Sequence, residues 1–363
     1  MVKKTFIIAE AGVNHNGSLK TALKLVETAA KIGADAVKFQ TFQANKLTSK
    51  KSHQSSLSKK TTSKSESQKD MISKLELSPS DHAALIKRCK KLGILFLSSP
   101  FDEESADLLF KLKIPIFKIP SGEITNKDLL QHIAKFNRPM ILSTGMSTLK
   151  EVKQAVSWIQ EIGYHHEEAK GRLGDLMNAV RWPRSARHDN FPHLTLLHCV
   201  TEYPAPFDQV NLKAMHTLSK NLKLSVGYSD HTPDIEIAIA SVALGATVIE
   251  KHFTLDQSMP GPDHKASLEP HDFQKMIISI RRVEQALGDG IKRPVPCELA
   301  NKNVARKSLV ATRDLKAGTQ LQSQDLVAKR PGTGIPPFMK EKIIGKVLRK
   351  KISTDDVLTW RHV

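Results

Sequence analysis

The sequence predicts a (β/α)₈ barrel followed by a small β-rich domain. Up to about residue 288, short apolar runs rich in β-branched residues alternate with longer amphipathic segments, which is typical of βα units around a parallel sheet. The 363 residues exceed what one hydrophobic core usually serves, so we expect two domains. A run containing glycines and prolines over 287–303 predicts an exposed connection between them.

Eight candidate strands lie in the first domain. Their apolar runs cover 6–9, 36–39, 94–97, 116–119, 140–142, 194–197, 224–227 and 247–249. Between them, segments 19–32, 81–92, 149–162 and 235–244 carry apolar residues at three- and four-residue spacing, which predicts amphipathic helices. Eight strand–helix units close naturally into a barrel.

The predicted boundaries divide the chain into a barrel domain at 1–285, a linker at 286–305 and a second domain at 306–363. The second domain holds strand-like runs at 307–311 and 346–352 and turns at 316–318 and 330–334. A module of about 60 residues is marginal on its own, so we expect it to pack on a barrel.

Composition points to a cytoplasmic protein with no membrane partner. The three cysteines imply no disulfide framework, which fits a reducing compartment. The apolar run near the N-terminus is too short for a signal peptide, and no later run is long enough to span a bilayer.

The formal charge of +18 would suit a protein that binds nucleic acid, and it would equally suit an enzyme with a small anionic substrate. Much of the excess lies in 46–74, a serine- and lysine-rich stretch typical of a solvated loop, and more lies in 172–187 and 340–351. Aromatic content is only 5%, so base-stacking platforms are scarce and an anionic small substrate is favoured. A nucleic-acid-associated factor would instead bind DNA or RNA with steep salt dependence.

Polar side chains follow nearly every predicted strand. In barrel enzymes the chemistry gathers at the carboxyl ends of the strands, so this ring predicts an active site. Its members are Glu10, Lys38, Gln40, Ser98, Ser99, Lys118, Ser121, Glu123, Ser143, Thr144, Thr201, Glu202, Tyr203, Ser229, His231 and His252.

Two lysines of this ring, Lys38 and Lys118, are embedded in apolar strands and therefore need a partner. Together with nearby hydroxyl groups they would form a cationic pocket suited to a phosphate and a carboxylate. In the alternative interpretation the serines cap the following helices and the lysines lie on the surface. The hydroxyls belong to Ser99, Ser121, Ser143 and Ser229.

His231 and His252 follow adjacent predicted strands, which would bring two imidazoles over one spot and leave coordination positions open. They could equally be capping or core histidines, and two ligands specify no metal. The carboxylates of Glu10, Glu123 and Asp263 could transfer protons or hold sugar hydroxyls. Asp263 lies in a rigid Pro-Gly-Pro-Asp-His sequence, where it could instead be a turn residue.

Six motifs spread along the chain resemble those of the sialic acid synthases, including bacterial N-acetylneuraminate and N,N′-diacetyllegionaminate synthases. The resemblance runs from residue 7 to residue 351, and its C-terminal part, with 305–308 and 329–334, looks like that family's antifreeze-like (SAF, β-clip) domain. The motifs are IAEAGVNHNG at 8–17, AVKFQT at 36–41, KIPSGE at 118–123, STGM at 143–146, GYSDHT at 227–232 and EKHFT at 250–254.

The resemblance implies condensation of phosphoenolpyruvate with an N-acetylated mannose-type sugar and release of phosphate, with Mn²⁺ or Mg²⁺ as cofactor. It implies His231 and His252 as metal ligands, and Glu10 and Asp263 as catalytic residues. It further implies that phosphoenolpyruvate is bound by Lys38, Ser99, Lys118, Ser121, Ser143 and Ser229, and the sugar by Gln40, Glu123, Tyr203, Asp263 and Arg330.

Members of this family are dimers in which the antifreeze-like domain of one chain covers the barrel mouth of the other and contributes an arginine, which Arg330 matches here. This chain departs from the family at an insertion over 165–190, which we interpret as a surface loop, and at Thr201 and Val304. These departures leave the acceptor open between N-acetylmannosamine and 2,4-diacetamido-2,4,6-trideoxymannose, although residues 201–206 are closer to the legionaminate branch.

A second hypothesis from another class is a non-catalytic barrel protein that binds an anion or a carbohydrate. The presence of Glu10, Lys38, His231, His252 and Asp263 argues against it, because binding alone does not need this combination of groups.

Overall fold

The computed structural model describes residues 4–47, 68–163 and 193–363. The chain divides into two compact units, Met1–Gly288 and Asp289–Val363, and each is considered by itself. The predicted insertion over 165–190 lies outside the described residues, as does most of the lysine-rich stretch over 46–74.

Unit 1 is built on an eight-stranded sheet in which every paired strand is parallel to its neighbour, in the order β3-β2-β1-β8-β7-β6-β5-β4. β3 and β4 lie beside each other at the two ends of this order, so the sheet forms a nearly closed barrel. The strands are β1 (Phe6–Gly12), β2 (Ala36–Thr41), β3 (Leu95–Pro100), β4 (Phe117–Ile119), β5 (Met140–Ser143), β6 (Leu194–Cys199), β7 (Ser225–Asp230) and β8 (Val248–His252).

The barrel prediction is therefore confirmed, with one systematic difference. All strands except β4 continue past the predicted apolar run at their carboxyl ends, β1 to Gly12 and β8 to His252 for example. The prediction ended each strand where polar residues begin. In a barrel those polar residues can stay in the strand, because they point into an enclosed cavity.

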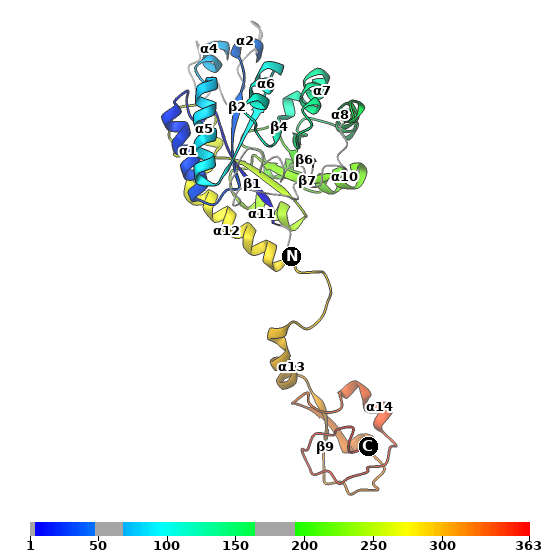
Figure 1. Ribbon diagram of the computed structural model, residues 1–363. Coiled ribbons are helices and arrows are strands. Elements are labelled where there is room, and N and C mark those ends of the chain that lie inside the picture. The colour runs from blue at the N-terminus through cyan, green and yellow to red at the C-terminus, as the bar shows by residue number, and fades with distance from the viewer. Residues whose placement is uncertain (1–3, 48–67, 164–192) are drawn as a thin grey trace. The chain divides into compact units, whose positions relative to one another are not determined.

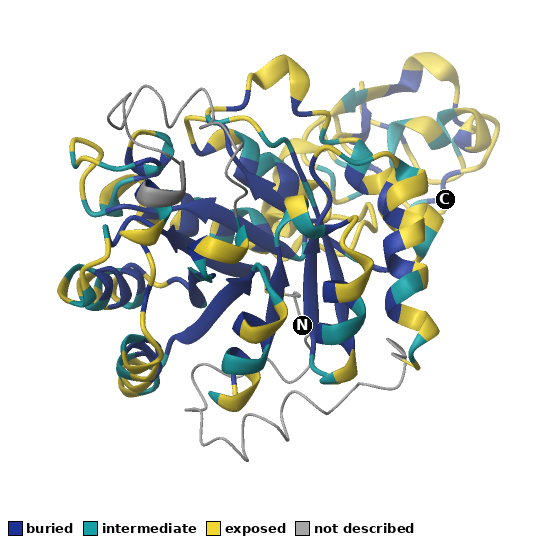
Figure 2. Cartoon of the chain, turned by 90° about the horizontal axis from the view of Figure 1, so that it is seen from above, coloured by how far each residue is buried: buried dark blue, intermediate teal, exposed yellow. Residues whose placement is uncertain are grey.

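Helices surround the barrel, with buried faces against the strands and exposed faces outward (Figures 1 and 2). Side chains cap several of them: Ser78 and Asp81 form a capping box on α5, and Thr148 and Glu151 form another on α8. The helices of unit 1 are α1 (Leu19–Lys31), α2 (Ala44–Leu47), α4 (Gln68–Ser73), α5 (Pro79–Leu92), α6 (Glu103–Lys111), α7 (Lys127–Lys135), α8 (Leu149–Glu161), α10 (Ala214–Leu222), α11 (Glu236–Ala243) and α12 (Pro270–Ala286).

The barrel core consists of strand residues buried on both faces of the sheet, as expected for a parallel sheet covered by helices. Ile7, Ile8 and Phe39 are fully buried, and the ring of Phe39 stacks on that of Phe96 with centroids 5.8 Å apart. Among the described residues, no helix is both long and apolar enough to cross a membrane.

Unit 2 has a small hydrophobic core of its own, centred on residues such as Leu309, Leu321 and Leu358. Its strands β9 (Ser308–Ala311) and β10 (Leu326–Lys329) pair antiparallel, and isolated bridges add short extended segments. The small β-rich module is thus confirmed. Within the segment predicted as a linker, residues Leu299–Ala305 form the helix α13, so the boundaries at 285 and 305 stay predictions.

Candidate active site

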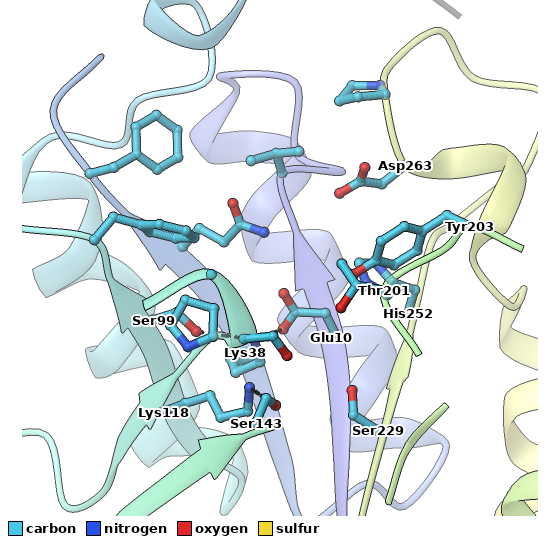
Figure 3. A pocket seen from close by; sticks show the side chains of 18 of the residues that line it. Glu10, Lys38, Ser99, Lys118, Ser143, Thr201, Tyr203, Ser229, His252 and Asp263 are labelled. Atoms are coloured by element: carbon cyan, nitrogen blue, oxygen red, sulfur yellow. Dashed lines mark hydrogen bonds and ion pairs between the residues drawn. The ribbon is translucent and has the colours of Figure 1, made fainter. Parts of the chain in front are cut away.

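A cavity of about 330 Å³ opens at the carboxyl ends of the barrel strands (Figure 3). Strand register explains its composition, because Glu10 on β1 lies directly opposite Lys38 on β2 and His252 on β8. Twelve of the predicted site residues line it together: Glu10, Lys38, Gln40, Ser99, Lys118, Ser121, Ser143, Tyr203, Ser229, His231, His252 and Asp263.

Two lysines and two glutamates form a buried ionic network in this cavity. The Lys38 ammonium lies 2.7 Å from Glu10 and 3.6 Å from Glu250, and the Lys118 ammonium lies 3.4 Å from Glu250. All four side chains are at most 6% exposed. The lysines therefore do not lie on the surface, and their charges are compensated before any substrate arrives.

The two carboxylates of the network have opposite protonation preferences. Burial raises the pKa of Glu10 to about 7, although Lys38 lowers it, and the negative charge of Glu250 raises it further. Burial opposes ionisation of Glu250 as well, but the ammonium groups of Lys118 and Lys38 together bring its pKa down to about 2. Glu250 is thus the carboxylate that favours the ionised form, while Glu10 is the one that more readily holds a proton.

The predicted serine hydroxyls point toward these charges. The Lys118 ammonium donates to Ser143 Oγ at 2.7 Å, the Lys38 ammonium donates to Ser99 Oγ at 3.2 Å, and Ser229 Oγ donates to Glu250 at 3.0 Å. Lys118, Ser143 and Ser229 lie at the bottom of the view in Figure 3. The hydroxyls and ammonium groups together form a surface that can bind a small dianion.

The serines do not cap the helices that follow their strands. After β3, the side chain that caps α6 is that of Asp102, and after β5 the one that caps α8 is that of Thr148. Ser121 Oγ instead accepts a hydrogen bond from the backbone of Gly145 at 3.0 Å and lies 3.1 Å from Cys199 Sγ.

His231 and His252 lie beside each other at the same cavity wall, with ring centroids 5.6 Å apart. His231 Nδ1 donates to the carbonyl oxygen of Val200 at 2.5 Å, which leaves the lone pair on Nε2, 3.4 Å from Ser229 Oγ. His252 Nδ1 is buried without a hydrogen-bond partner. Burial lowers the pKa of His231 to about 4 and that of His252 well below its usual value, so both rings are neutral.

Two neutral imidazoles, one oriented by a backbone carbonyl and one with an unpartnered nitrogen, fit a divalent cation that takes its remaining ligands from substrate and water. Across residues 4–47, 68–163 and 193–363, no group of three or more histidine, cysteine or acidic side chains is arranged to hold a metal. The pair therefore suits an open catalytic site better than a closed structural one.

Tyr203 and Asp263 flank the imidazoles near the cavity mouth. The Tyr203 ring lies 4.2 Å from that of His231 and 5.3 Å from that of His252. Burial raises the pKa of Asp263 to about 6. The Asp263 side chain makes no helix-capping hydrogen bond, so the turn is formed by its backbone and the carboxylate is free to face the cavity.

Gly12 leaves room for these carboxylates. Its φ of +50° is in the left-handed region, and a Cβ there would lie 3.2 Å from Glu10 Oε1 and 3.5 Å from Asp263 Oδ2. A larger residue would crowd both acids and strain the backbone.

The opposite side of the cavity is apolar. This wall comes from the end of β1, the segments around α2 and α4, and the residue after β3, and part of it forms a hydrophobic cluster separate from the barrel core. The sequence interpretation missed it, although Met71, Ile72 and Leu75 stand out at helical spacing beside a lysine- and serine-rich stretch. The wall consists of Val13, Phe42, Leu47, Met71, Ile72, Leu75 and Phe101.

Two residues that the resemblance assigns to the site are not part of the cavity lining, and neither are Ser98, Thr144 and Glu202 of the predicted ring. Glu123 directly follows the lining residues Ser121 and Gly122, but its carboxylate accepts a hydrogen bond from Asn126 Nδ2 at 2.8 Å. Arg330 belongs to unit 2, where its Nε donates to the carbonyl oxygen of Ala305 at 3.1 Å.

The sequence interpretation also missed Glu250. The signal was present, because Glu250 and His252 are two positions apart on a strand and therefore share a face. The histidine was selected from this motif and the glutamate was not.

Comparison with known proteins agrees with these features. The NeuB family profile matches residues 25–292 and the SAF domain profile matches residues 306–363. The chain is 49% identical to the N,N′-diacetyllegionaminic acid synthase of Campylobacter jejuni (98% of this chain, 99% of that protein). It is 44% identical to the enzyme of the same name from Legionella pneumophila (99% and 94%).

A solved structure shares the fold. The N-acetylneuraminic acid synthetase of Leptospira borgpetersenii, crystallised with citrate, superposes with a TM-score of 0.68 at 30% identity, covering 82% of this chain and 90% of that one. The non-catalytic alternative finds no support among these relatives. The resemblance inferred from the motifs is confirmed, and the chain belongs to the NeuB family, with a C-terminal SAF domain.

Proposed function

We propose that this protein condenses phosphoenolpyruvate with 2,4-diacetamido-2,4,6-trideoxymannose and water, producing N,N′-diacetyllegionaminic acid and inorganic phosphate. The observation that carries the proposal is the buried network of Lys38, Lys118 and hydroxyl groups beside two neutral imidazoles at the carboxyl end of a barrel. The names of the two relatives with 49% and 44% identity support this acceptor. N-acetylmannosamine is the alternative acceptor.

Phosphoenolpyruvate fits the cationic side of the cavity. Its phosphate and carboxylate would take hydrogen bonds from the two lysines and from Ser99, Ser121, Ser143 and Ser229, all of which line the cavity. Burial lowers the pKa of Lys118, and a bound anion would raise it again and keep the ammonium charged.

His231 and His252 would hold the cofactor, which we propose to be Mn²⁺ or Mg²⁺. The NeuB-type synthases are generally metal-dependent. When bound, the cation supplies a Lewis acid that polarises the aldehyde oxygen of the open-chain sugar. Tyr203, packed on both rings, restricts their rotation.

Glu10 is the proposed proton-transfer group. In the reaction, C3 of phosphoenolpyruvate forms a bond to the aldehyde carbon, a water oxygen adds to C2, and the bond from C2 to the bridging oxygen breaks as phosphate leaves. The aldehyde oxygen must gain a proton, and the water must lose both of its protons as its oxygen becomes the C2 carbonyl, the second one leaving with phosphate. A carboxyl group with a pKa of about 7 can do either at neutral pH, and Asp263, with a pKa of about 6, is a second candidate.

The acceptor would lie between Asp263, Gln40 and Tyr203 on one side and the apolar wall on the other. Two acetamido methyls and the C6 methyl of the diacetamido sugar can pack against Phe42, Phe101 and their neighbours. The C6 hydroxyl of N-acetylmannosamine would find no hydrogen-bond partner on these side chains. Glu123, close to the cavity rim, stays a proposed sugar contact.

We further propose a dimer in which the SAF domain of one chain covers the barrel mouth of the other and brings Arg330 to the sugar. Arg330 is exposed, which leaves its guanidinium accessible to a ligand. A cover of this kind would exclude bulk water from the reaction. A cytoplasmic location is also proposed, since Cys89, Cys199 and Cys297 are all free thiols.

The test is an incubation of purified protein with phosphoenolpyruvate, Mn²⁺ and, separately, each of the two sugars. Phosphate release and formation of the nine-carbon ketoacid are followed, with His231→Ala as the control. Turnover of the diacetamido sugar that is lost in the control supports the proposal. Turnover of N-acetylmannosamine alone would replace the acceptor, and no turnover of either would reject the synthase reaction.

A further inference from the structure

A buried ion pair lies on the outer face of the barrel, behind the two imidazoles. The Lys251 ammonium is 2.7 Å from Asp230 Oδ2, and the two side chains are 2% and 0% exposed. The same ammonium donates to the carbonyl oxygen of Thr232 at 2.8 Å. Neither charged residue lines the cavity, so neither can contact substrate there.

Each member of the pair directly precedes one of the imidazoles in the chain: Asp230 precedes His231, and Lys251 precedes His252. Asp230 lies opposite Lys251 in the parallel ladder. β7 ends at Asp230, and β8 ends one residue after Lys251, at His252. Because side chains alternate between the two faces of a strand, His252 points into the cavity while Lys251 points outward. His231, which follows Asp230 directly, points into the cavity as well.

Asp230 and Lys251 also hold the backbone of Thr232, the residue that follows His231. Asp230 Oδ1 accepts hydrogen bonds from the Thr232 backbone N–H at 3.0 Å and from the Thr232 hydroxyl at 2.8 Å. Lys251 binds the carbonyl of the same residue from the neighbouring strand. The segment that carries His231 is therefore attached to its own strand and to the strand of His252.

This attachment acts where the regular ladder has ended. Beyond Asp230 the backbone leaves β7, so the position of His231 relative to His252 depends on local contacts. His231 is also held by its Nδ1, which donates to the Val200 carbonyl, and by its own carbonyl, which accepts from the Ala205 backbone at 2.8 Å, while His252 Nδ1 has no hydrogen-bond partner. The buried pair thus adds a side-chain link between the two chain segments that carry the imidazoles, at the end of the ladder that joins their strands.

We propose that Asp230 and Lys251 are positioning residues that hold His231 and His252 at the separation needed to bind a divalent cation together. The inference rests on the proposed metal-dependent function and deepens it. Residues that orient metal ligands from outside the coordination sphere typically change metal affinity by about 10- to 100-fold when they are removed.

The experiment measures Mn²⁺ binding to the full-length protein without substrates, by calorimetry, in the double variant Asp230→Asn/Lys251→Met. Removing both charges avoids leaving one of them buried and uncompensated. The single variant Asp230→Asn, which keeps a side-chain oxygen for Thr232 but leaves the Lys251 charge without its partner, provides a second test, and thermal unfolding checks that each variant is folded. Arg281→Met is the matched control, because it removes an ion pair with Asp35 and Glu284 away from the imidazoles.

We expect the Mn²⁺ dissociation constant to rise about 10- to 100-fold in the double variant and to stay within about twofold in Arg281→Met. At saturating Mn²⁺, kcat should recover to within a few-fold of the wild-type value, which separates positioning from a direct catalytic role. Folded variants that bind Mn²⁺ as tightly as the wild type would overturn the inference.

The outcome also separates this inference from the proposed reaction. If the wild type binds Mn²⁺ and the double variant binds it more weakly, the positioning role stands even when neither sugar is converted. If the wild type converts a sugar but binds no Mn²⁺, the synthase reaction stands and the positioning role is rejected.

Discussion

The two ends of the barrel both contain buried carboxylates paired with basic side chains, but they use them differently. At the amino end, Asp35 accepts hydrogen bonds from the backbone of Ile7 at 2.9 Å, from Lys4 at 2.8 Å and from Arg281 at 2.9 Å. Arg281 also donates to Glu284 at 2.7 Å. These groups therefore join the first strand, the start of the second and the last helix of the unit to one another.

At the carboxyl end, the carboxylates and ammonium groups surround a cavity. Glu10 and Glu250 share Lys38, and their pKa values are displaced to about 7 and about 2. Buried ion pairs are costly to form, and this network joins Lys38 on β2 and Lys118 on β4 to Glu250 on β8 across the cavity, although neither strand is a neighbour of β8 in the sheet. The comparison teaches that the same chemical groups serve stability at one end and substrate binding at the other.

The largest expected effect comes from Lys118→Met at the carboxyl end. Loss of a buried ammonium that would contact the anionic substrate should lower kcat/KM for phosphoenolpyruvate by about 10²- to 10³-fold. Thermal unfolding is measured as well, because Glu250 loses one of its two buried partners and keeps only Lys38, so some loss of stability is expected. Steady-state phosphate release measures the effect. A folded variant with activity within about threefold of wild type would contradict the assignment of this end to catalysis.

Glu250→Gln is expected to lower activity by about 10- to 100-fold, because a charged hydrogen-bond partner of two lysines becomes neutral. It also removes a negative charge that raises the pKa of Glu10. Without that charge the pKa of Glu10 is lower. The step near pH 7 in a plot of kcat/KM against pH should therefore move to lower pH. The variant Glu10→Gln, which lacks this carboxyl group, should show no such step. An unmoved step in Glu250→Gln would mean that another group titrates there.

The smallest effect on activity is expected at the amino end. Arg281→Met leaves Asp35 and Glu284 without one partner, and the free energy of unfolding should fall by about 1–3 kcal/mol, less than for a completely buried pair because Arg281 is partly exposed. Activity should stay within about twofold. Urea unfolding and the phosphate-release assay measure the two quantities. A loss of activity without a loss of stability would remove the distinction between the two ends.

Much of the site could be predicted from local patterns alone. Lys38 and Lys118 were identified because a charged residue inside an apolar strand requires a buried partner, and the structure shows both in contact with carboxylates. His231 and His252 were identified because they follow consecutive strands, whose carboxyl ends meet. Glu250 could have been found by the same alternation that places His252 in the cavity.

Other features depend on contacts between segments far apart in the chain. The apolar wall joins Val13, Phe42 and Leu75, which no periodicity connects. The shift in the pKa of Glu10 depends on its burial and on the nearby charges of Lys38 and Glu250. Glu10, Lys38 and Glu250 belong to three different strands.

The sequence by itself determined the eight strands, the helices between them and the polar residues at the strand ends, because these follow from periodicity and from the cost of burying unpaired charge. Only the tertiary structure decided which of those residues meet. It brings Glu250 between the two lysines and leaves Glu123 outside the cavity lining. The physical reason is that pairing and pKa depend on distances of a few ångströms, which the register between strands sets and local sequence does not.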